Sequence, residues 1–198
     1  MALPLLTVDV YALFTKNAKL GSSVAERQKR FQADLDNANR VWKTGFINNG
    51  SVQCNIQFVN AGIYNYSDTK TINSETIPYP PFPGDVNSLI NQFRARSGIK
   101  KRAIFVVYVS GNKFKSGDIG LGGYQFIGSD YWGKVALTNL AADNINKFTF
   151  AHEAGHVFGL GHSGLSNNIM NAPVTSSSPL VTTSQCTTAR KSKVIRGN

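Results

Sequence analysis

The sequence predicts an α/β (α+β) fold: a twisted mixed sheet of about five strands with one antiparallel edge strand. Three observations support this. Predicted strands alternate with predicted helices over the first two thirds of the chain, which is typical of a mixed sheet with helices packed on it. Residues 102–110, RAIFVVYVS, are apolar almost throughout, as expected of a strand buried on both faces. Neither a repeat nor a linker divides the 198 residues, so we expect one domain.

The first part of the chain contains a strand followed by a helix. Residues 7–14 are rich in β-branched and aromatic side chains, which is typical of a strand. Ser23 and Glu26 are spaced as in a capping box, and apolar residues follow at steps of three and four up to Trp42. This pattern predicts a helix from about Ser23. The residues expected to end the helix are Gly45 and Asn49-Gly50.

The middle of the chain is expected to hold a strand, a loop and a short helix. Residues 51–62 form the second predicted strand. Residues 66–84 should form a loop, because prolines do not fit a regular element. These prolines are Pro78, Pro80, Pro81 and Pro83. Asp85 is placed to cap a helix over residues 86–96.

Three further elements precede the C-terminal segment. A glycine-rich stretch at 117–123 leads into a short edge strand at 124–127, and residues 135–140 are another predicted strand. A helix is expected from about 148 to 160. The remaining residues are rich in Ser, Thr and Asn, so we expect a loop there, with a weak helix starting at Pro179.

The composition indicates a folded protein with a basic surface. Hydrophobic residues make up 41% of the chain and charged residues 16%, which argues against a solvated, disordered chain. The net charge is +10, and residues 90–115 contain bases and no acid. We interpret the bases as a solvated face. No zinc-finger, RRM or P-loop sequence is present, so no nucleic-acid partner is expected.

No apolar run approaches the length of a membrane span, so no membrane span is expected. The opening sequence MALPLL is too short for the core of a signal peptide and has no basic segment before it. We therefore expect any secretion signal or pro-segment to be absent from this chain.

All three histidines of the chain lie in residues 152–162, HEAGHVFGLGH, which match H-E-x-x-H-x-x-G-x-x-H at every specified position. His152 and His156 are four residues apart, so both can reach one Zn²⁺ from the same face of a helix. Gly159 can turn the chain back, which brings His162 to the metal as a third ligand. Three ligands leave the fourth position for water, which is typical of a catalytic site.

Glu153 is the expected catalytic residue. It follows His152 directly, so it can flank the metal without ligating it. The predicted function is a zinc-dependent endopeptidase, in which Glu153 takes the proton from a zinc-bound water that hydrolyses a peptide bond. The alternative is a catalytically weak binding or toxin module that keeps zinc for stability.

The methionine at position 170 follows the third histidine in the sequence NNIMNAP. Together with the histidine motif, Met170 resembles the metzincin clan of zinc endopeptidases, in which a Met-turn lies beneath a three-histidine zinc site. The zinc motif is most similar to that of the matrixins, including Ser163, and the Met-turn is similar to that of the reprolysins. The resemblance implies a secreted enzyme with one catalytic zinc ion, a zinc helix, a Met-turn and a small C-terminal subdomain.

The resemblance also implies how the chain is divided. We expect one metzincin-like catalytic domain over residues 1–198, with an upper subdomain (1–160) that carries the zinc helix and a small C-terminal subdomain (161–198). The protein should act as an extracellular monomer. Its partner would be a protein or peptide substrate that lies extended along the edge strand.

Two segments supply the candidate substrate-binding residues. Glycines in the edge strand would let a substrate backbone approach closely. The candidates there are Gly122, Gly123 and Tyr124. By resemblance, the pocket for the residue after the scissile bond is walled by Ala172, Pro173 and Val174. Val157 or Phe158 should lie nearby, and because none of these side chains is charged, we expect the pocket to accept an apolar side chain.

Features of some related families are missing. No histidine remains for the structural zinc of matrixins, and Ala172 stands where astacins and serralysins place a tyrosine ligand. No Asp or Glu follows Glu153, so a carboxylate latch for a freed N-terminus is not expected.

Calcium is a further possibility. Asp118 and Asp130 lie in predicted loops and carboxylates suit Ca²⁺, but two scattered carboxylates do not support a site.

The two cysteines leave two alternatives. Cys54 lies on a predicted early strand, and Cys186 follows the Met-turn. A disulfide between them would tie the C-terminal segment to the upper subdomain, as suits an extracellular protein. The other possibility is two buried, reduced thiols.

Overall fold

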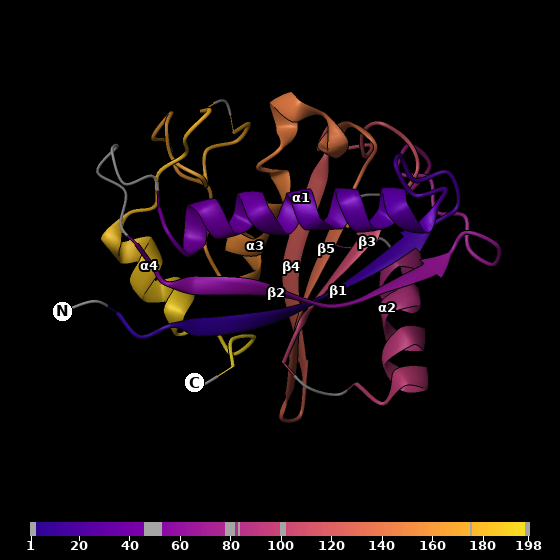
Figure 1. Cartoon of the computed structure of the whole chain (residues 1–198), viewed down its shortest axis with the longest axis horizontal. Coiled ribbons are helices and arrows are strands. Elements are labelled where there is room, and N and C mark those ends of the chain that lie inside the picture. Colours follow the sequence, from indigo (N-terminus) through magenta and orange to yellow (C-terminus); the bar gives the residue numbers. More distant parts are fainter. Residues whose placement is uncertain are drawn as a thin grey trace.

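A five-stranded mixed sheet forms the centre of the protein, with helices on both of its faces (Figure 1). The computed structural model describes residues 3–45, 53–77, 82, 84–99, 102–174 and 176–196. The strand order is β2-β1-β3-β5-β4, with β4 antiparallel to β5 and the other pairs parallel. The strands are β1 (Leu6–Thr15), β2 (Ile56–Tyr66), β3 (Ile104–Tyr108), β4 (Gly120–Ile127) and β5 (Asp130–Leu137). The predicted α/β fold with one antiparallel edge strand is confirmed.

The sheet is strongly twisted. In Figure 1, β1 and β2 run across the view, whereas β4 and β5 run up and down it. The right-handed twist of each strand accumulates from one edge of the sheet to the other. At the β4 edge this twist carries the β4–β5 hairpin beyond the other strands, at the bottom of the view.

Two hydrophobic clusters cover the two faces of the sheet. One cluster includes residues of α1 (Val24–Trp42), α3 (Thr149–Val157) and α4 (Thr183–Arg190), and the other includes residues of α2 (Gly84–Ser97). Along β3 the side chains alternate between the clusters, so this strand is buried on both faces, as its apolar sequence predicts. Two short 3₁₀ helices, Leu140–Ala142 and Asn144–Asn146, lie between β5 and α3.

A buried polar cluster fixes α1 on the sheet. The Tyr108 hydroxyl donates to Asp34 Oδ2 at 2.8 Å, and Arg30 donates to the Thr138 carbonyl at 2.9 Å. The Arg30 guanidinium also lies 4.5 Å from the centre of the Tyr108 ring. Burial raises the pKa of Asp34 to about 6, against the opposing effects of Arg30 and Tyr108. Because buried polar groups need such partners, this cluster determines where α1 can sit.

The predicted capping box of α1 is present. The Ser23 side chain accepts from the Glu26 N–H at 3.1 Å, and the Glu26 carboxylate accepts from the Ser23 N–H at 3.2 Å. The helix ends at Trp42, and Gly45 follows in a left-handed conformation (φ 61°). Two sets of residues named above lie outside the described part of the chain: Asn49-Gly50 and the loop prolines Pro78, Pro80, Pro81 and Pro83.

The edge strand is longer than predicted. β4 begins at Gly120 rather than at Tyr124, so the glycine-rich stretch lies partly inside the strand. Glycine usually weakens a strand. Here Gly120 and Gly122 lie where β4 packs directly against α3 and a side chain would not fit.

The strand β5 begins before its predicted start at 135 and ends before its predicted end at 140. Gly133 lies inside the strand. A Cβ at Gly133 would overlap a methyl group of Val157 and come within 2.9 Å of Ile104 Cγ1. Close packing between β5 and α3 therefore explains this glycine.

Other elements also differ from prediction at their ends. β2, predicted over 51–62, starts later and continues past Gly62. A bulge shifts the register opposite Val10 and Tyr11 of β1, and the two strands stay paired beyond it. α2, predicted over 86–96, begins at Gly84, so Asp85 lies in its first turn. α4 begins after Pro179, at a capping box formed by Thr182 and Gln185.

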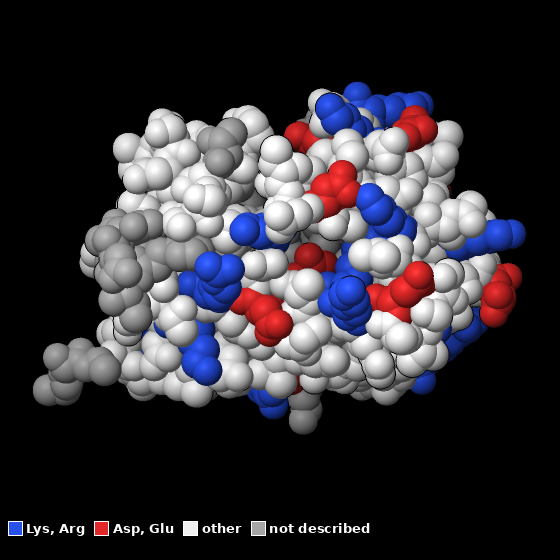
Figure 2. Space-filling model, turned by 45° about the horizontal axis from the view of Figure 1, so that its top comes forward, with Lys and Arg blue, Asp and Glu red and all other residues white. Residues whose placement is uncertain are grey.

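Charges of both signs are interspersed on the face drawn in Figure 2. Part of the predicted basic face is not solvated. Arg94 lies against the Trp132 ring, 3.4 Å from its centre, and pairs with Asp130 at 3.4 Å. Among the described residues, no helix has the length and apolar character needed to cross a bilayer.

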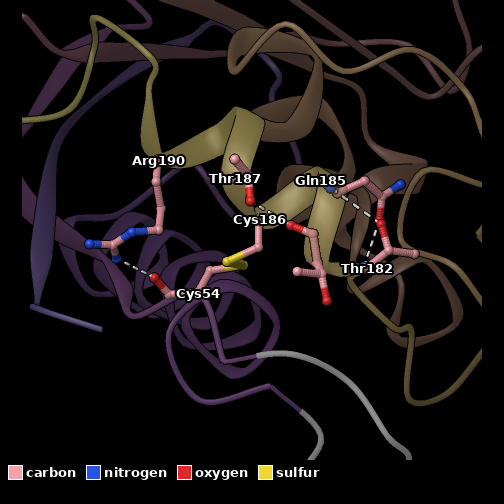
Figure 3. Close-up of a disulfide and its surroundings, with 7 residues drawn as sticks. Cys54, Thr182, Gln185, Cys186, Thr187 and Arg190 are labelled. Atoms are coloured by element: carbon pink, nitrogen blue, oxygen red, sulfur yellow. Dashed lines mark hydrogen bonds between the residues drawn. A yellow bond between two sulfur atoms is a disulfide. The ribbon is translucent and has the colours of Figure 1, made fainter. Parts of the chain in front are cut away.

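A disulfide joins Cys54 to Cys186, with their Cα atoms 5.2 Å apart (Figure 3). The Arg190 guanidinium donates to the Cys54 carbonyl at 2.6 Å. Nearby, the Arg196 N–H donates to the Thr7 carbonyl at 2.9 Å. The predicted disulfide is present, and the C-terminal segment is held against the beginnings of β1 and β2.

Removing the disulfide should lower stability. The bond spans 132 residues, so it restricts the unfolded chain strongly, and replacing both cysteines by alanine should lower the free energy of unfolding by about 2–4 kcal/mol. Urea unfolding with and without a reductant measures this. The wild type should lose stability in reductant and the variant should not. Two thiols labelled in unfolded, unreduced wild-type protein would contradict the bond.

Candidate functional site

The helix α3 places two histidines on one face and then turns sharply. His152 and His156 lie one turn apart, and the helix ends with Phe158 as its C-cap. Gly159 has φ 89° and its N–H donates to the His156 carbonyl, while the Leu160 N–H donates to the Gly155 carbonyl, both at 3.0 Å. This is a Schellman arrangement, which requires a left-handed residue at the position of Gly159. The turn brings His162 back towards α3.

The three imidazoles converge on one point. The Nε2 atom of His156 lies 3.2 Å from Nε2 of His152 and 3.2 Å from Nε2 of His162. The ligand atoms of all three lie within 4.8 Å of one another, and no other such group of His, Cys, Asp or Glu occurs in the described part of the chain. His152 is buried, His156 is half-buried and His162 is exposed, so the point of convergence faces the solvent side of α3.

Two of the rings are oriented by backbone carbonyls. His152 Nδ1 lies 2.7 Å from the Ile169 carbonyl, and His156 Nδ1 lies 2.8 Å from the Leu160 carbonyl. A carbonyl oxygen can only accept, so each Nδ1 carries the proton. Each Nε2 therefore keeps a lone pair directed at the point of convergence, as metal-binding histidines require.

Burial keeps these imidazoles neutral. It lowers the pKa of His152 to about 4 and also lowers the pKa of His156. The neighbouring histidines act in the same direction, whereas the carbonyl hydrogen bonds oppose the shift. Neutral imidazole is the form that binds a metal ion.

Glu153 is buried beside the cluster, on α3 and beneath β4. Burial raises the pKa of its carboxyl to about 8, and the nearby charge of Asp118 adds to the shift. Its Oε1 and Cγ atoms lie directly under Gly120. A carboxyl held this deeply in a cleft has a strongly perturbed proton affinity, which is common at catalytic positions.

Met170 lies under the histidines and is fully buried. Gly155, between the two histidines of α3, faces it, and a Cβ there would overlap Met170 Sδ and come within 3.0 Å of its Cε. The Met170 carbonyl accepts from the Ser163 N–H at 2.7 Å. The helix and the segment that carries the third histidine are thereby packed together.

A cavity of about 880 Å³ opens beside the histidines and Glu153. Its described lining includes Gly122 and the predicted wall residues Ala172, Pro173 and Val174. Gly123 and Tyr124 are not among its lining residues. At the mouth, Lys113 and Asp118 supply one charge of each sign.

The rest of the cavity lining differs from prediction. Val157 and Phe158 do not line it but are buried in the core, where Val157 packs against Gly133 of β5 and Phe158 against the rings of Trp42 and Phe58. Their place is taken by residues that sequence reasoning missed, which are Leu140, Asn146, Phe148 and Thr149. The 3₁₀ helices carry the first two to the cavity, and no local sequence signal predicts that placement.

The backbone ladder determines which residues of β4 face the open edge of the sheet. Just before β4, the Thr138 N–H donates to the Ile119 carbonyl at 3.1 Å, and the register continues without a shift. In an antiparallel ladder, hydrogen bonding to the neighbouring strand alternates along the chain. Gly123 therefore directs its backbone groups to β5. The residues whose N–H and C=O groups face the open edge are Gly120, Gly122, Tyr124 and Phe126.

The two aspartates considered for calcium do not come together as ligands. Asp130 pairs with Arg94, and Asp118 lies at the mouth of the cavity. Neither belongs to a group of potential ligands in the described residues.

The residues present fit a zinc ion. Three imidazoles offer converging Nε2 atoms, and carbonyls hold two of the rings in place. Zn²⁺ takes such nitrogen ligands in tetrahedral geometry, and three protein ligands leave one position open.

Comparisons with known proteins agree with this geometry. The solved structure of metalloproteinase-II from Bacteroides fragilis aligns with a TM-score of 0.56 and 16% identity, over 96% of this chain and 54% of that one. This chain thus spans about half the length of that protein, and the likeness shows the fold. A structure of a chaperone–substrate complex aligns with 17% identity over 84% of this chain and 28% of that one. Its TM-score of 0.48 is too low to carry an argument. No curated protein matches the chain.

The family is shown by the sequence as a whole. The model Reprolysin_5, described as Metallo-peptidase family M12, matches residues 7–195, almost the entire chain. This agrees with the three-histidine group and with the metzincin resemblance of the sequence. The chain therefore belongs to Metallo-peptidase family M12.

Proposed function

We propose that the protein is a zinc endopeptidase that cleaves extended segments of protein substrates. The observation that supports this best is the convergence of three histidine Nε2 atoms beside a buried glutamate, in a cleft at the open edge of a strand. Each part has a use in peptide hydrolysis, and the parts lie within one cavity.

His152, His156 and His162 would hold the metal. When bound, Zn²⁺ would polarise the scissile carbonyl and lower the pKa of a water molecule. Glu153 lies beside the cluster, where its carboxylate can accept the proton of the attacking water and then donate it to the leaving amine. Its burial excludes bulk water from this proton transfer.

The substrate would lie along β4. Open-edge backbone groups of Gly120, Gly122 and Tyr124 can pair with an extended peptide, and such main-chain pairing accepts many sequences. An edge strand with unpaired backbone groups favours this use. An endopeptidase needs both ends of the peptide to pass the site, and β4 extends past the cavity towards Ile127.

The pocket for the residue after the scissile bond would be the apolar part of the cavity. Its lining includes Ala172, Pro173 and Val174, together with Leu140 and Phe148. The two mouth charges, Lys113 and Asp118, lie outside this apolar set. A charged side chain forced into it would lose its hydration without a partner.

The subdomains proposed from the sequence suit this cleft. Residues 1–160 would form the upper part, with β4 and α3, and residues 161–198 the lower part, with Met170 and the pocket wall. We propose that the enzyme works outside the cell as a monomer, and the disulfide supports an oxidising environment.

Zinc should bind once per chain and stabilise the fold. Elemental analysis should find one zinc per wild-type chain, and a chelator should lower the unfolding temperature, because an ion that binds the folded state stabilises it. In His152→Ala/His156→Ala, zinc should be lost and the chelator should have no effect. Zinc retained by this variant would place the metal elsewhere.

Replacing Glu153 should stop catalysis and spare the metal. Glu153→Ala should lower kcat by at least ~10²–10⁴-fold, as expected for a lost general base. Zinc content should stay near one per chain, because Glu153 is not a required ligand. Cleavage of a peptide library with internal bonds, followed by mass spectrometry, measures both the rate and the endopeptidase activity.

The matched control is Asp68→Ala, which removes an exposed carboxylate that does not line the cavity. It should cleave at the wild-type rate. If Glu153→Ala also does so, the proposed mechanism is wrong. If the wild type binds zinc and peptide but cleaves nothing, the protein is a binding module instead.

The cleavage profile should show an apolar residue after the cut. Leu, Met and Phe should differ by only ~1–3 kcal/mol, because apolar pockets discriminate weakly between apolar side chains. Val174→Phe should shift preference towards smaller residues, whereas Val24→Phe, at an exposed position on α1, should not. A profile dominated by Lys, Arg, Asp or Glu would show that these walls are assigned wrongly.

A further inference from the structure

The strand β4 approaches the helix α3 so closely at Gly120 and Gly122 that no side chain on the strand would fit between them. Three short contacts arise when a Cβ is placed at Gly120: 2.6 Å to Thr149 Cγ2, 2.8 Å to Glu153 Oε1 and 3.0 Å to Glu153 Cγ. At Gly122, a Cβ would overlap the Glu153 carbonyl oxygen and lie 2.9 Å from both its carbonyl carbon and its Cα. Both glycines therefore meet the same residue of the helix, and that residue is the glutamate.

The two contacts differ in kind. At Gly122 the partner is helix backbone, which cannot move without separating β4 from α3. At Gly120 one partner is the end of a flexible side chain, the Glu153 carboxylate, which can move aside. Gly122 thus sets the distance between strand and helix, and Gly120 leaves the space that the carboxylate occupies.

The same two residues also face the open edge of the sheet with their backbone groups. A peptide paired with Gly120 and Gly122 would lie directly beside the carboxylate beneath them. By contrast, Gly123 faces the other side of the strand, where a Cβ has 3.9 Å to the Phe82 ring. The need for glycine is therefore confined to the face that meets Glu153.

We infer that Gly120 and Gly122 are positioning residues for Glu153, fixing its carboxylate relative to a substrate held on β4. This inference rests on the proposed peptidase function. A carboxylate displaced by about 1 Å can lose about 10²-fold in rate, because proton transfer depends on geometry. The two glycines act through Glu153 and do not themselves touch the transferred proton.

The test is Gly120→Ala, measured with peptide cleavage. We expect kcat to fall by about 10–10²-fold, with KM changed by less than about threefold, because the displaced group acts in the chemical step and not in peptide binding. Zinc content should remain at one per chain. Gly84→Ala, at a site where a Cβ meets nothing within 4 Å, should keep wild-type kcat and KM.

A double-mutant cycle separates positioning from general damage. In the Glu153→Ala background, Gly120→Ala should change the residual rate by less than about threefold, because the group it displaces is gone. An equal fold-loss in both backgrounds would overturn the inference.

Gly120→Ala could also lower kcat by destabilising the fold, and Thr149→Ser serves as the control for this effect. Thr149→Ser removes the methyl group closest to the added Cβ. It keeps the hydroxyl that donates to the Asn146 carbonyl at 2.7 Å. Gly120→Ala/Thr149→Ser should regain the unfolding temperature of Thr149→Ser while kcat stays low. If kcat recovers together with stability, the glycine serves packing only, and the inference fails.

A crystal structure of metal-free Gly120→Ala provides a readout without activity. The Glu153 carboxylate should be displaced from its wild-type position, with α3 and β4 otherwise in place. An unmoved carboxylate contradicts the inference. An inactive wild-type enzyme with a displaced carboxylate in the variant would instead contradict the proposed function alone.

Discussion

The close packing of α3 against everything around it is the constraint on which the rest of the site depends. Four contacts of this helix involve a glycine: Gly120 and Gly122 of β4 meet Glu153, Gly133 of β5 meets Val157, and Gly155 of the helix itself meets Met170. In each case a Cβ would overlap the partner or come within van der Waals distance of it. At each of these contacts one partner is the bare backbone of a glycine, which cannot adjust as a side chain can. Rigid placement of this kind is what a catalytic constellation needs, because its groups act only in a narrow range of geometry.

The C-terminal segment completes the site that α3 begins. The Ile169 carbonyl orients His152, Met170 packs beneath the histidines, and Ala172–Val174 forms one wall of the cavity. This segment has little regular structure before α4, and isolated hydrogen bonds hold it together, such as that from the Ile169 N–H to the Leu180 carbonyl at 2.9 Å. The disulfide to Cys54 and the backbone pairing of Arg196 with Thr7 attach its far end to the sheet. These distant attachments therefore support the geometry of the metal-binding residues.

The sequence predicts the chemistry of this protein better than the shape of its cleft. The histidine spacing, the Ser23 capping box and the apolar run of β3 are local patterns with one physical solution, and the structure agrees with each of them. The start of β4 was predicted too late, after Gly120 and Gly122, because a local rule treats glycine as a break in a strand. Their real partners are side chains and backbone of α3, far away in the sequence. Leu140 and Phe148 were missed for a similar reason: the tertiary fold alone carries them to the cavity.

The most direct measurement of the central claim is a crystal structure of the zinc-loaded protein with a non-cleavable peptide analogue, using anomalous scattering at the zinc edge. The account predicts one zinc ion, ligated by Nε2 of His152, His156 and His162. The analogue should pair with the open edge of β4 at Gly120 and Gly122, with the Glu153 carboxylate beside its central peptide bond. A zinc ion bound elsewhere, or a peptide seated away from β4 and Glu153, would contradict the account.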